Sequence, residues 1–480
     1  MKRFSTLTLI VLIFCQSTGT AQSIVHFRIS KPLCLLTFLE AANKQWDASR
    51  TYSAYIYKHV PVANREDFYR MVDRFASINM STYRPSDDLP AARQKNKSVY
   101  NIIKGTAVRS KYTEKFLHNS IGIMPDDQLQ KLRDVMYWAE PYYNDMIWKE
   151  YKDDAERQLK ELEKYTGKVD IIFGKLKDFY GSSWPANTSF EIGIYPIPGE
   201  HGHTTATPHG NNLVLAVLTG ERNYAMRIGV AVHEMCHVLY DRQPFRTQWR
   251  EDSAFAAQRS GYAKYAYTYF DEALATACGN GWAYEYLTGH TDKGNWYDNT
   301  YINNYAKAIY PMVKSYIHRH KRIDEAFIKN AIDQFKKKFP DAVSDYDNLL
   351  NRVSLYTDAA NMDEMHWINK TLRKYYNITS CSSSFPIADN QTLNLVKRSP
   401  GTQLFIIHHN HSEDFALLRQ IFPELRKVHA DRESLISFTD RKKRPVIILN
   451  VDGIDRVNNG LRKMVQQKNM NSEDMVSKID

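Results

Sequence analysis

Residues 233–237 read His-Glu-Met-Cys-His and lie within an apolar run, residues 228–240, in which Glu234 is the only charged side chain. A segment that is apolar on nearly every side is typical of a buried helix. On a helix, two histidines four residues apart stand about 40° from each other, so both imidazoles can reach one metal ion. Ionisable side chains are costly to bury unless they are paired or bind metal. The motif therefore predicts a buried helix that carries a metal site.

The predicted metal is one zinc ion, held by His233 and His237, because imidazole nitrogens are typical zinc ligands. Glu234 lies about 100° around the helix from His233, too far to join the ligands easily. It can reach a water bound to the same ion and act as a general base. The alternative interpretation is a core helix whose histidines hydrogen-bond to backbone carbonyls without any metal.

The motif and its uncharged flanks resemble the signature of the zincin metallopeptidases, over roughly residues 185–320. The resemblance implies hydrolysis of a peptide bond by a zinc-activated water, with a peptide or protein as the substrate. Metzincins carry a glycine and a third histidine after the motif, whereas this chain has Tyr240 and Gln243 at those positions. The resemblance is therefore to gluzincins, in which a glutamate from a following helix is the third zinc ligand.

Two glutamates are candidates for that third ligand. Glu272 lies in residues 267–278, an apolar and alanine-rich segment that predicts a helix able to pack closely on the motif helix. A carboxylate buried there needs a partner. Glu251 lies in a polar stretch that is typical of a surface loop. We therefore predict Glu272 as the ligand, with Asp271 orienting a histidine from outside the site or replacing Glu272 in an aspzincin-like arrangement.

Two segments ahead of the motif, residues 190–198 and 212–218, read as strands. In zincins, an edge strand just before the motif helix pairs with an extended substrate backbone, and the resemblance gives residues 212–218 that role. The connection between the two strands holds three histidines, which are either metal ligands or, as is usual in loops, solvated. They are His201, His203 and His209.

Helical periodicity is present on both sides of this region. Residues 125–165 and 297–339 read as long helices, and residues 169–173 read as a strand. Tyr301 and Tyr305, in the second helical region, are candidates to donate a hydrogen bond to the tetrahedral intermediate, as a Tyr or His does in many zincins. The alternative is that they belong to a helical aromatic stripe, which is typical of a core.

The first 21 residues combine a short basic start, an apolar run and small residues at the cleavage positions, as in a secretory signal peptide. We therefore expect a secreted or periplasmic protein. Cys15 permits a lipoprotein interpretation, but Phe14 is bulkier than the small residue that such cleavage normally needs. No later segment approaches the roughly twenty apolar residues that a membrane span requires.

Charge and cysteine content constrain the partners. The formal net charge is +10, but the basic runs lack the aromatic interleaving of a nucleic-acid-binding module, so nucleic acid is not an expected partner. Four cysteines follow the predicted signal peptide, and an even number can pair fully in an oxidising compartment. A bridge between the two proposed site helices and buried free thiols both remain open, and the oligomeric state is not specified. The four are Cys34, Cys236, Cys278 and Cys381.

A chain of 480 residues has room for two or three domains. We predict an α+β fold, with a mostly helical zincin-like domain that contains a small antiparallel or mixed sheet, followed by a small C-terminal α/β module. A linker rich in Ser, Asn, Thr and Pro, residues 386–400, separates the two. The predicted regions are the signal peptide (1–21), an N-terminal region without a chemical motif (22–125), the zincin-like domain (126–385) and the accessory module (401–480).

The module contains His408, His409 and His411, which suggest a second metal site. No carboxylate or cysteine at ligand spacing accompanies them, so the sequence does not favour one. A different class of function is also open: a secreted binding or adhesion protein with a structural or vestigial zinc site. Glu234 argues against that class, because a purely structural zinc site needs no base.

Overall fold

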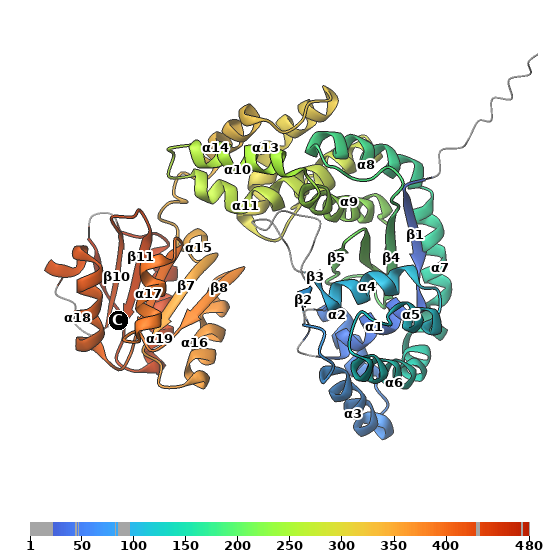
Figure 1. Cartoon of the computed structure of the whole chain (residues 1–480), viewed down its shortest axis with the longest axis horizontal. Helices are drawn as coiled ribbons and strands as arrows, with labels where there is room; N and C mark the ends of the chain where they lie inside the picture. Colours follow the sequence, from blue (N-terminus) through green and yellow to red (C-terminus); the bar gives the residue numbers. More distant parts are fainter. Residues whose placement is uncertain are drawn as a thin grey trace, which may run out of the picture. The chain divides into compact units, whose positions relative to one another are not determined.

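The computed structural model describes residues 23–43, 46, 48–81, 83–84, 97–428, 433–471 and 474–479. The predicted signal peptide, with Cys15, lies outside these residues. The chain divides into two compact units, the first formed by Met1–Asp178 with Ser182–Arg242 and the second by Phe179–Gly181 with Gln243–Asp480. The described part is mostly helical, with two mixed sheets and one short strand pair, which confirms the predicted α+β class (Figure 1).

The sheet of the first unit has the strand order β1-β4-β6-β5. The strands β4 (Phe190–Ile197) and β6 (Asn212–Leu218) confirm the two predicted strands, and both are buried at every position because both faces of the sheet are covered. β4 runs parallel to β1 (Val25–Ile29) and to β6, whereas β5 (Ala206–His209) is antiparallel to β6. The prediction that residues 212–218 form an edge strand is therefore wrong, because β5 covers that edge.

Helices surround this sheet. Alternate positions of β4 and β6, among them Tyr195 and Val214, belong to one apolar core with the N-terminal helices. Gly193 of β4 lies so close to α1 that an added Cβ would be 2.5 Å from Leu33 Cδ2. The helices are α1 (Lys31–Ala42), α2 (Arg50–His59), α3 (Arg65–Ala76), α4 (Val99–Arg109), α5 (Thr113–Asn119), α6 (Asp126–Tyr143), the π-helical turn η3 (Asn144–Trp148), α7 (Lys149–Glu163), α8 (Thr166–Tyr180) and α9 (Tyr224–Asp241).

The predicted strand at residues 169–173 is wrong, because this segment lies inside α8. The fully buried side chains of α8 include Val169, Ile172 and Leu176, which repeat at helical spacing, whereas Ile171 is 49% exposed. A short apolar run cannot by itself distinguish a strand from a buried helix segment. The burial of the neighbouring turns shows the helical period.

The second unit begins with a helical region. Its helix α11 packs against α10, α13 and α14. Tyr269, Tyr301 and Phe335 stack across α11, α13 and α14, with 5.3 Å between the ring centroids of the two tyrosines. The helices are α10 (Phe245–Ala257), α11 (Ala263–Thr276), the π-helical turn η4 (Ala277–Ala283), α12 (Tyr284–Thr288), α13 (Thr300–His318) and α14 (Glu325–Lys338), so the predicted helical region at 297–339 is confirmed.

The rest of the second unit is an α/β module around a sheet of strand order β12-β10-β11-β9-β7-β8. β7 pairs in parallel with β8 and with β9, and β9 pairs in parallel with β11, while β10 is antiparallel to its neighbours. One apolar core covers each face of the sheet. The strands are β7 (Arg352–Thr357), β8 (Ser380–Ser384), β9 (Thr402–Ile407), β10 (Ser434–Thr439), β11 (Pro445–Asn450) and β12 (Val476–Lys478), and the helices are α15 (Tyr346–Leu349), α16 (Met362–Tyr375), α17 (Asn390–Arg398), α18 (His411–Ile421) and α19 (Val457–Gln467).

The predicted linker at residues 386–400 lies within this module. It contains α17 and connects β8 to β9, and both strands belong to the same sheet. The polar composition of the segment reflects an amphipathic helix on the outside of the sheet, in which Thr392 and Val396 are buried. The α/β module therefore begins before β7, well ahead of residue 401.

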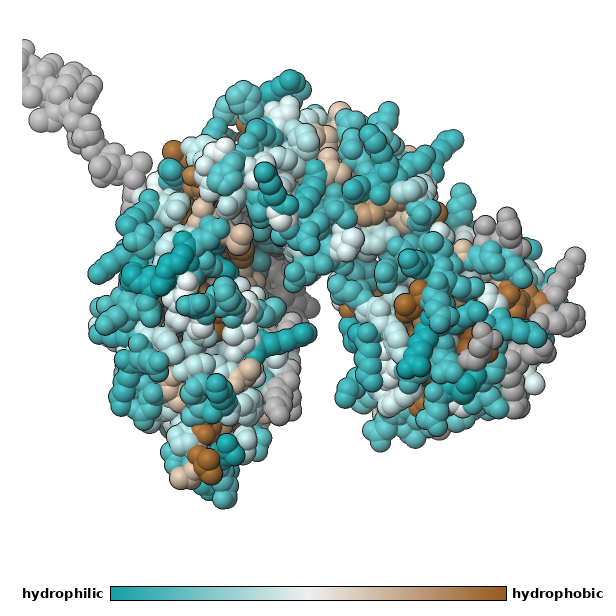
Figure 2. Space-filling model, turned by 180° about the vertical axis from the view of Figure 1, so that it is seen from behind, coloured by the Kyte–Doolittle hydropathy of each residue, from teal (hydrophilic) through white to brown (hydrophobic). Residues whose placement is uncertain are grey.

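Hydrophilic side chains cover most of the face of the molecule in Figure 2, where apolar residues form only small patches. None of the helices that the structure describes is both long enough and apolar enough to cross a membrane.

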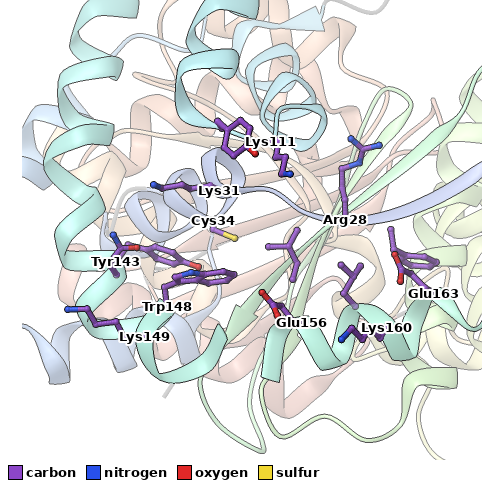
Figure 3. Close-up of a pocket in the computed structure, with 15 residues that line it drawn as sticks. Arg28, Lys31, Cys34, Lys111, Tyr143, Trp148, Lys149, Glu156, Lys160 and Glu163 are labelled. Carbon is purple, nitrogen blue, oxygen red and sulfur yellow. The ribbon is translucent and has the colours of Figure 1, made fainter. Parts of the chain in front are cut away.

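The first unit contains a cavity of about 910 Å³, shown in Figure 3. Burial raises the pKa of its Cys34 thiol to about 11, so this thiol is protonated near neutral pH and is a poor nucleophile. The cavity combines Tyr143 and Trp148 with basic side chains and contains none of the predicted zinc ligands. The basic residues are Arg28, Lys31, Lys111, Lys149 and Lys160.

Candidate metal centre

The motif lies on α9, as predicted. The helix begins after Asn223, whose side chain accepts a hydrogen bond from the backbone N–H of Met226. None of residues 228–240 is exposed. The apolar flanks of the motif therefore have their expected role, which is to bury the helix.

The two histidines of the motif present the same ring nitrogen to each other. The Nε2 atoms of His233 and His237 are 3.1 Å apart, and the two rings are nearly perpendicular, at 80°. Two nitrogens bound to one tetrahedral zinc, each roughly 2.0–2.1 Å from the ion, are roughly 3.3 Å apart. The observed spacing is therefore close to that of two imidazole ligands of one zinc ion.

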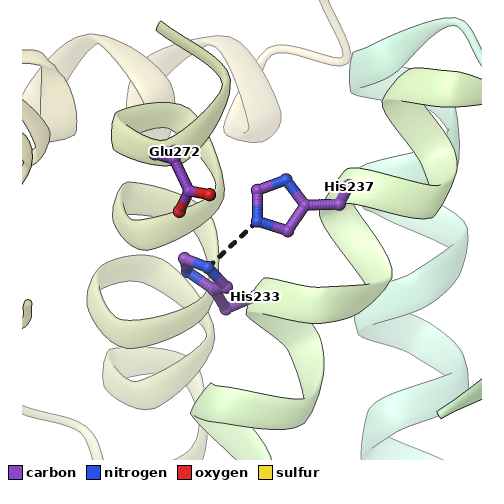
Figure 4. A group of neighbouring side chains, drawn as sticks. All are labelled: His233, His237 and Glu272. Atoms are coloured by element: carbon purple, nitrogen blue, oxygen red, sulfur yellow. Dashed lines mark hydrogen bonds between the residues drawn. The ribbon is translucent and has the colours of Figure 1, made fainter. Parts of the chain in front are cut away.

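Glu272 of α11 completes a group of three potential ligands. One ligand atom each from His233, His237 and Glu272 lie within 4.8 Å of one another, and Figure 4 shows the carboxylate facing the two rings. His233 is buried, and the other two residues are half-buried. Two imidazole nitrogens and one carboxylate oxygen form a donor set that suits zinc, and three protein ligands leave one tetrahedral position for a water or substrate. The structure therefore contains a His/His/Glu group that is close enough to bind a metal ion.

The competing glutamate, Glu251, has a different environment. It is 1% exposed and accepts a hydrogen bond of 2.8 Å from Nε2 of Gln243, and it is not part of the three-residue group. The prediction of a surface loop around it is wrong, because residues 245–257 form α10. Gln248, Glu251, Ala254 and Phe255 are buried at helical spacing, while the polar residues between them face outward. Asp271 is half-buried next to Glu272 and is also outside the group.

Glu234 is half-buried and lies one position after His233 on α9. The helical offset of about 100° per residue directs it to one side of the two histidines. It is not among the three grouped side chains. This position agrees with a residue that flanks a metal site without being one of its ligands.

The three histidines between β4 and β6 do not contribute to either group of potential metal ligands among the described residues. His201 and His203 are exposed, as expected for loop residues. His209 is buried at the end of β5, where its ring contacts Oδ1 of Asn101 at 2.8 Å and Oγ1 of Thr207 at 3.0 Å. Burial, reinforced by the charge of Lys104, lowers the pKa of His209 to about 3. His209 is therefore a neutral core residue.

Tyr301 and Tyr305, the two candidates for stabilising the tetrahedral intermediate, both lie among packed aromatic side chains. Tyr301 donates a hydrogen bond from its hydroxyl to the carboxylate of Asp345, and its ring stacks on Tyr269. Tyr305 is fully buried, with its ring against Phe335 at 5.1 Å between centroids, and burial raises the pKa of its hydroxyl. These contacts favour the aromatic core interpretation over a role in stabilising an oxyanion.

The four cysteines within the described residues are free thiols. Cys236 of α9 and Cys278 of η4, which the sequence allowed to form a bridge, are both buried and unbridged. The Tyr180 hydroxyl lies 3.9 Å from the Cys278 sulfur. The open question between a disulfide and buried thiols is therefore resolved in favour of thiols.

A second group of potential metal ligands, which the sequence did not favour, lies in the α/β module. It consists of Glu364, His408 and His409, whose ligand atoms also lie within 4.8 Å of one another. Glu364 is separated from His408 by 44 residues. Glu364 is far from the histidines in the sequence, so the fold brings this carboxylate to them.

No protein-family model matches the sequence, and neither any curated protein nor any solved structure reaches the threshold of a match. The chemistry of the side chains and their geometry are therefore what indicate a function.

Proposed function

We propose that the protein is a secreted or periplasmic zinc metallopeptidase of the gluzincin-like type, with His233, His237 and Glu272 as the ligands of one zinc ion. The observation that supports this proposal is the group of three donor atoms within 4.8 Å, two of them on a buried helix with the predicted motif. The donor set is that of a zinc site that keeps one position open. Peptides or unfolded protein segments are the proposed substrates.

Bound zinc would supply a Lewis acid that polarises the scissile carbonyl and lowers the pKa of the attacking water. Glu234 is the proposed general base, because it flanks the ligand pair on α9 without belonging to it. It would accept the proton of the attacking water and donate it to the leaving amine. The apolar surroundings of α9, with no exposed position in residues 228–240, limit the access of bulk water to this carboxylate.

An extended substrate would pair with the edge strand of a sheet. The sequence predicted residues 212–218, which form β6, as this strand, whereas the edge strand on that side of the sheet is β5. β5 is the outer strand of the first sheet, and it packs against α9, which carries the motif. Pro208 has no N–H group, so β5 offers fewer donors than a regular strand of its length. Backbone pairing with β5 would hold a peptide with little demand on its side chains.

The second candidate function is a binding or adhesion protein in which the metal is structural or vestigial. A structural zinc site is normally closed by four protein ligands. Here the group has three, with Glu234 beside it. This ligand count favours the enzyme, and activity measurements separate the two functions.

The test uses the purified full chain, elemental analysis and a diverse peptide library read by mass spectrometry. We expect chelator-sensitive cleavage, and we expect Glu234→Gln to keep the zinc of the wild type while its rate falls by about 10²–10⁴, the usual contribution of a general base. His233→Ala should contain one zinc equivalent less than the wild type. The matched control is Glu66→Gln, at an exposed position in the first turn of α3.

Cleavage by Glu234→Gln at the wild-type rate would remove this residue from the mechanism. Cleavage that persists after the zinc has been chelated would contradict a zinc-dependent peptidase. Wild-type protein that holds zinc at the motif and cleaves no peptide in the library would favour the binding-protein alternative.

A further inference from the structure

The α/β module contains a point at which ligands characteristically bind. β8 pairs with one side of β7 and β9 with the other, all three in parallel, so the chain reverses its direction of winding between β7 and β9. In open α/β sheets, ligands bind outside the carboxyl ends of the strands at such a switch point. Asp358 directly follows β7, and His408 directly follows β9.

Asp358 organises this switch point. Its side chain is fully buried and accepts hydrogen bonds from the backbone N–H groups of His408, His409 and Asn410, at 3.0, 2.8 and 2.7 Å. These three hydrogen bonds fix the backbone that carries both histidines.

Asp358 also orients the ring of His408. Its Oδ1 lies 2.7 Å from Nδ1 of His408, whose side chain is fully buried. This contact leaves Nε2 of the ring directed away from Asp358 and toward Glu364. A histidine that binds metal through one nitrogen usually has a carboxylate or carbonyl on the other, which fixes its tautomer and its direction.

Three potential ligand atoms lie close together next to the His408 ring: its own Nε2, Nε2 of His409 and Oε2 of Glu364. Nε2 of His408 and Nε2 of His409 lie 3.4 and 3.3 Å from the same oxygen of Glu364, Oε2. Hydrogen bonds between nitrogen and oxygen are usually 2.7–3.2 Å long. The observed separations are longer than this range and close to the roughly 3.3 Å between two ligands of one tetrahedral ion.

Glu364 is held in place by the backbone just ahead of its helix. It lies in the first turn of α16, and Oε2 also accepts a hydrogen bond of 2.9 Å from the backbone N–H of Ala360. The exposed fractions of the side chains increase from 0% for His408 through 24% for Glu364 to 42% for His409. The group thus has a buried anchor and one side that is open to solvent.

We propose that Glu364, His408 and His409 form a second site for a divalent transition metal of the zinc class, with Asp358 as a positioning residue for His408. The donor set, two imidazole nitrogens and one carboxylate oxygen, suits zinc and excludes a preference for calcium or magnesium, which favour oxygen ligands. The three ligands leave a coordination position on the solvent side for water or an anionic ligand. This site lies entirely within the α/β module and does not depend on the proposed function of the first site.

The test counts zinc ions on the full chain after removal of metal with a chelator and stepwise addition of zinc chloride. The wild type should bind two equivalents at micromolar concentration or below, and the variant His233→Ala/His237→Ala should bind one. In that double variant, Glu364→Gln and His409→Ala should each weaken the remaining zinc by more than about 10–100-fold, the range for losing a residue that only supports a ligand. The matched control is His366→Ala, an exposed position on α16 outside the group.

The two test residues are suitable because they are not in the core. Glu364→Gln keeps the size of the side chain, and His409 is exposed, so circular dichroism should show a folded protein in each case. Loss of all zinc binding in His233→Ala/His237→Ala would overturn the second site. Unchanged zinc affinity in both Glu364→Gln and His409→Ala would overturn it as well. A wild type that binds one zinc, retained in the double variant, would support the second site and contradict the first.

Discussion

The two His/Glu groups of this chain use the same three side-chain types and are built by different secondary structures. In the first group, one helix supplies both histidines four residues apart, and a carboxylate comes from a second helix. In the second group, two adjacent histidines follow a strand, and the carboxylate comes from a helix that follows a neighbouring strand. A helix brings residues of fixed short spacing together, whereas a parallel sheet brings together strand ends that are far apart in the sequence.

This difference explains why one group is visible in the sequence and the other is not. The spacing of His233 and His237 is set by the helical repeat, so it appears as a local motif. Asp358 and His408 are 50 residues apart and meet only because β7 and β9 are neighbours. In the second group, His408 has a carboxylate on its second ring nitrogen.

The largest effect is expected at the carboxylate of the first group. Glu272→Gln should weaken the zinc of that group by more than about 10–100-fold and abolish the proposed peptidase activity, because a neutral amide replaces a charged ligand. Glu251→Gln should leave the zinc in place, since Glu251 is outside the group and its partner is Gln243. Competition with a chromophoric zinc chelator measures both variants.

The second site must be empty or blocked for this measurement to be clear. We therefore expect the difference in zinc affinity between Glu272→Gln and Glu251→Gln to be clearest in a His409→Ala background, in which the second group no longer competes for zinc. Weaker zinc binding in Glu251→Gln together with an unchanged Glu272→Gln would reverse the assignment of the third ligand.

A second prediction concerns the boundary of the α/β module. A fragment of residues 341–480 should fold cooperatively, because both core clusters of the sheet lie within it. A fragment of residues 395–480 should not fold, since it lacks β7, β8 and α16, which supply parts of both cores and of the second metal group. Thermal melts followed by circular dichroism separate the two outcomes.

This pair of fragments also tests the independence of the two groups. The longer fragment contains Glu364, His408 and His409, so it should bind one zinc equivalent without the motif helix. A cooperative melt of the shorter fragment would place the module boundary at the predicted linker and would contradict a module that includes β7.

The sequence predicted the elements whose signal is local and strong. The buried helix around residues 228–240 and the strands at 190–198 and 212–218 agree with the structure, because burial and periodicity coincide there. Glu272 lies close enough to His233 and His237 to bind the same metal ion, and its role as a zinc ligand stays a prediction. The same reasoning failed where one sequence pattern is compatible with two kinds of secondary structure. The apolar run at residues 169–173 is as compatible with a buried helix as with a strand, and only its neighbours show the period.

The remaining errors arise because composition reveals neither which face of a helix is buried nor which distant segments pair. Glu251 has polar neighbours, but helical spacing buries it while they remain on the outside. The largely polar residues 386–400 belong to a sheet module whose first strands precede them. A module predicted to begin at residue 401 excludes Asp358 and Glu364, and so it excludes the carboxylates of the second group.

The smallest predicted effect concerns a histidine that is buried without a carboxylate or a metal. The folded state holds His209 neutral, with a pKa of about 3, whereas an unfolded chain titrates near 6.5. Below pH 6.5 the unfolded state therefore binds the additional proton, and stability decreases as the pH falls toward 3. At pH 5 the loss is about 2 kcal/mol, since each pKa unit corresponds to about 1.4 kcal/mol.

Urea unfolding at pH 7.5 and pH 5 measures this loss, and His209→Gln should reduce the difference between the two pH values by about 2 kcal/mol. His201→Gln, at an exposed position of the same connection, serves as the control and should leave the difference unchanged. Metal affinity also depends on pH, so both variants are compared after chelation and in the His233→Ala/His409→Ala background. An unchanged pH dependence in His209→Gln would show that His209 is accessible to protons in the folded state, and the distinction between core and metal-binding histidines would lose its clearest example.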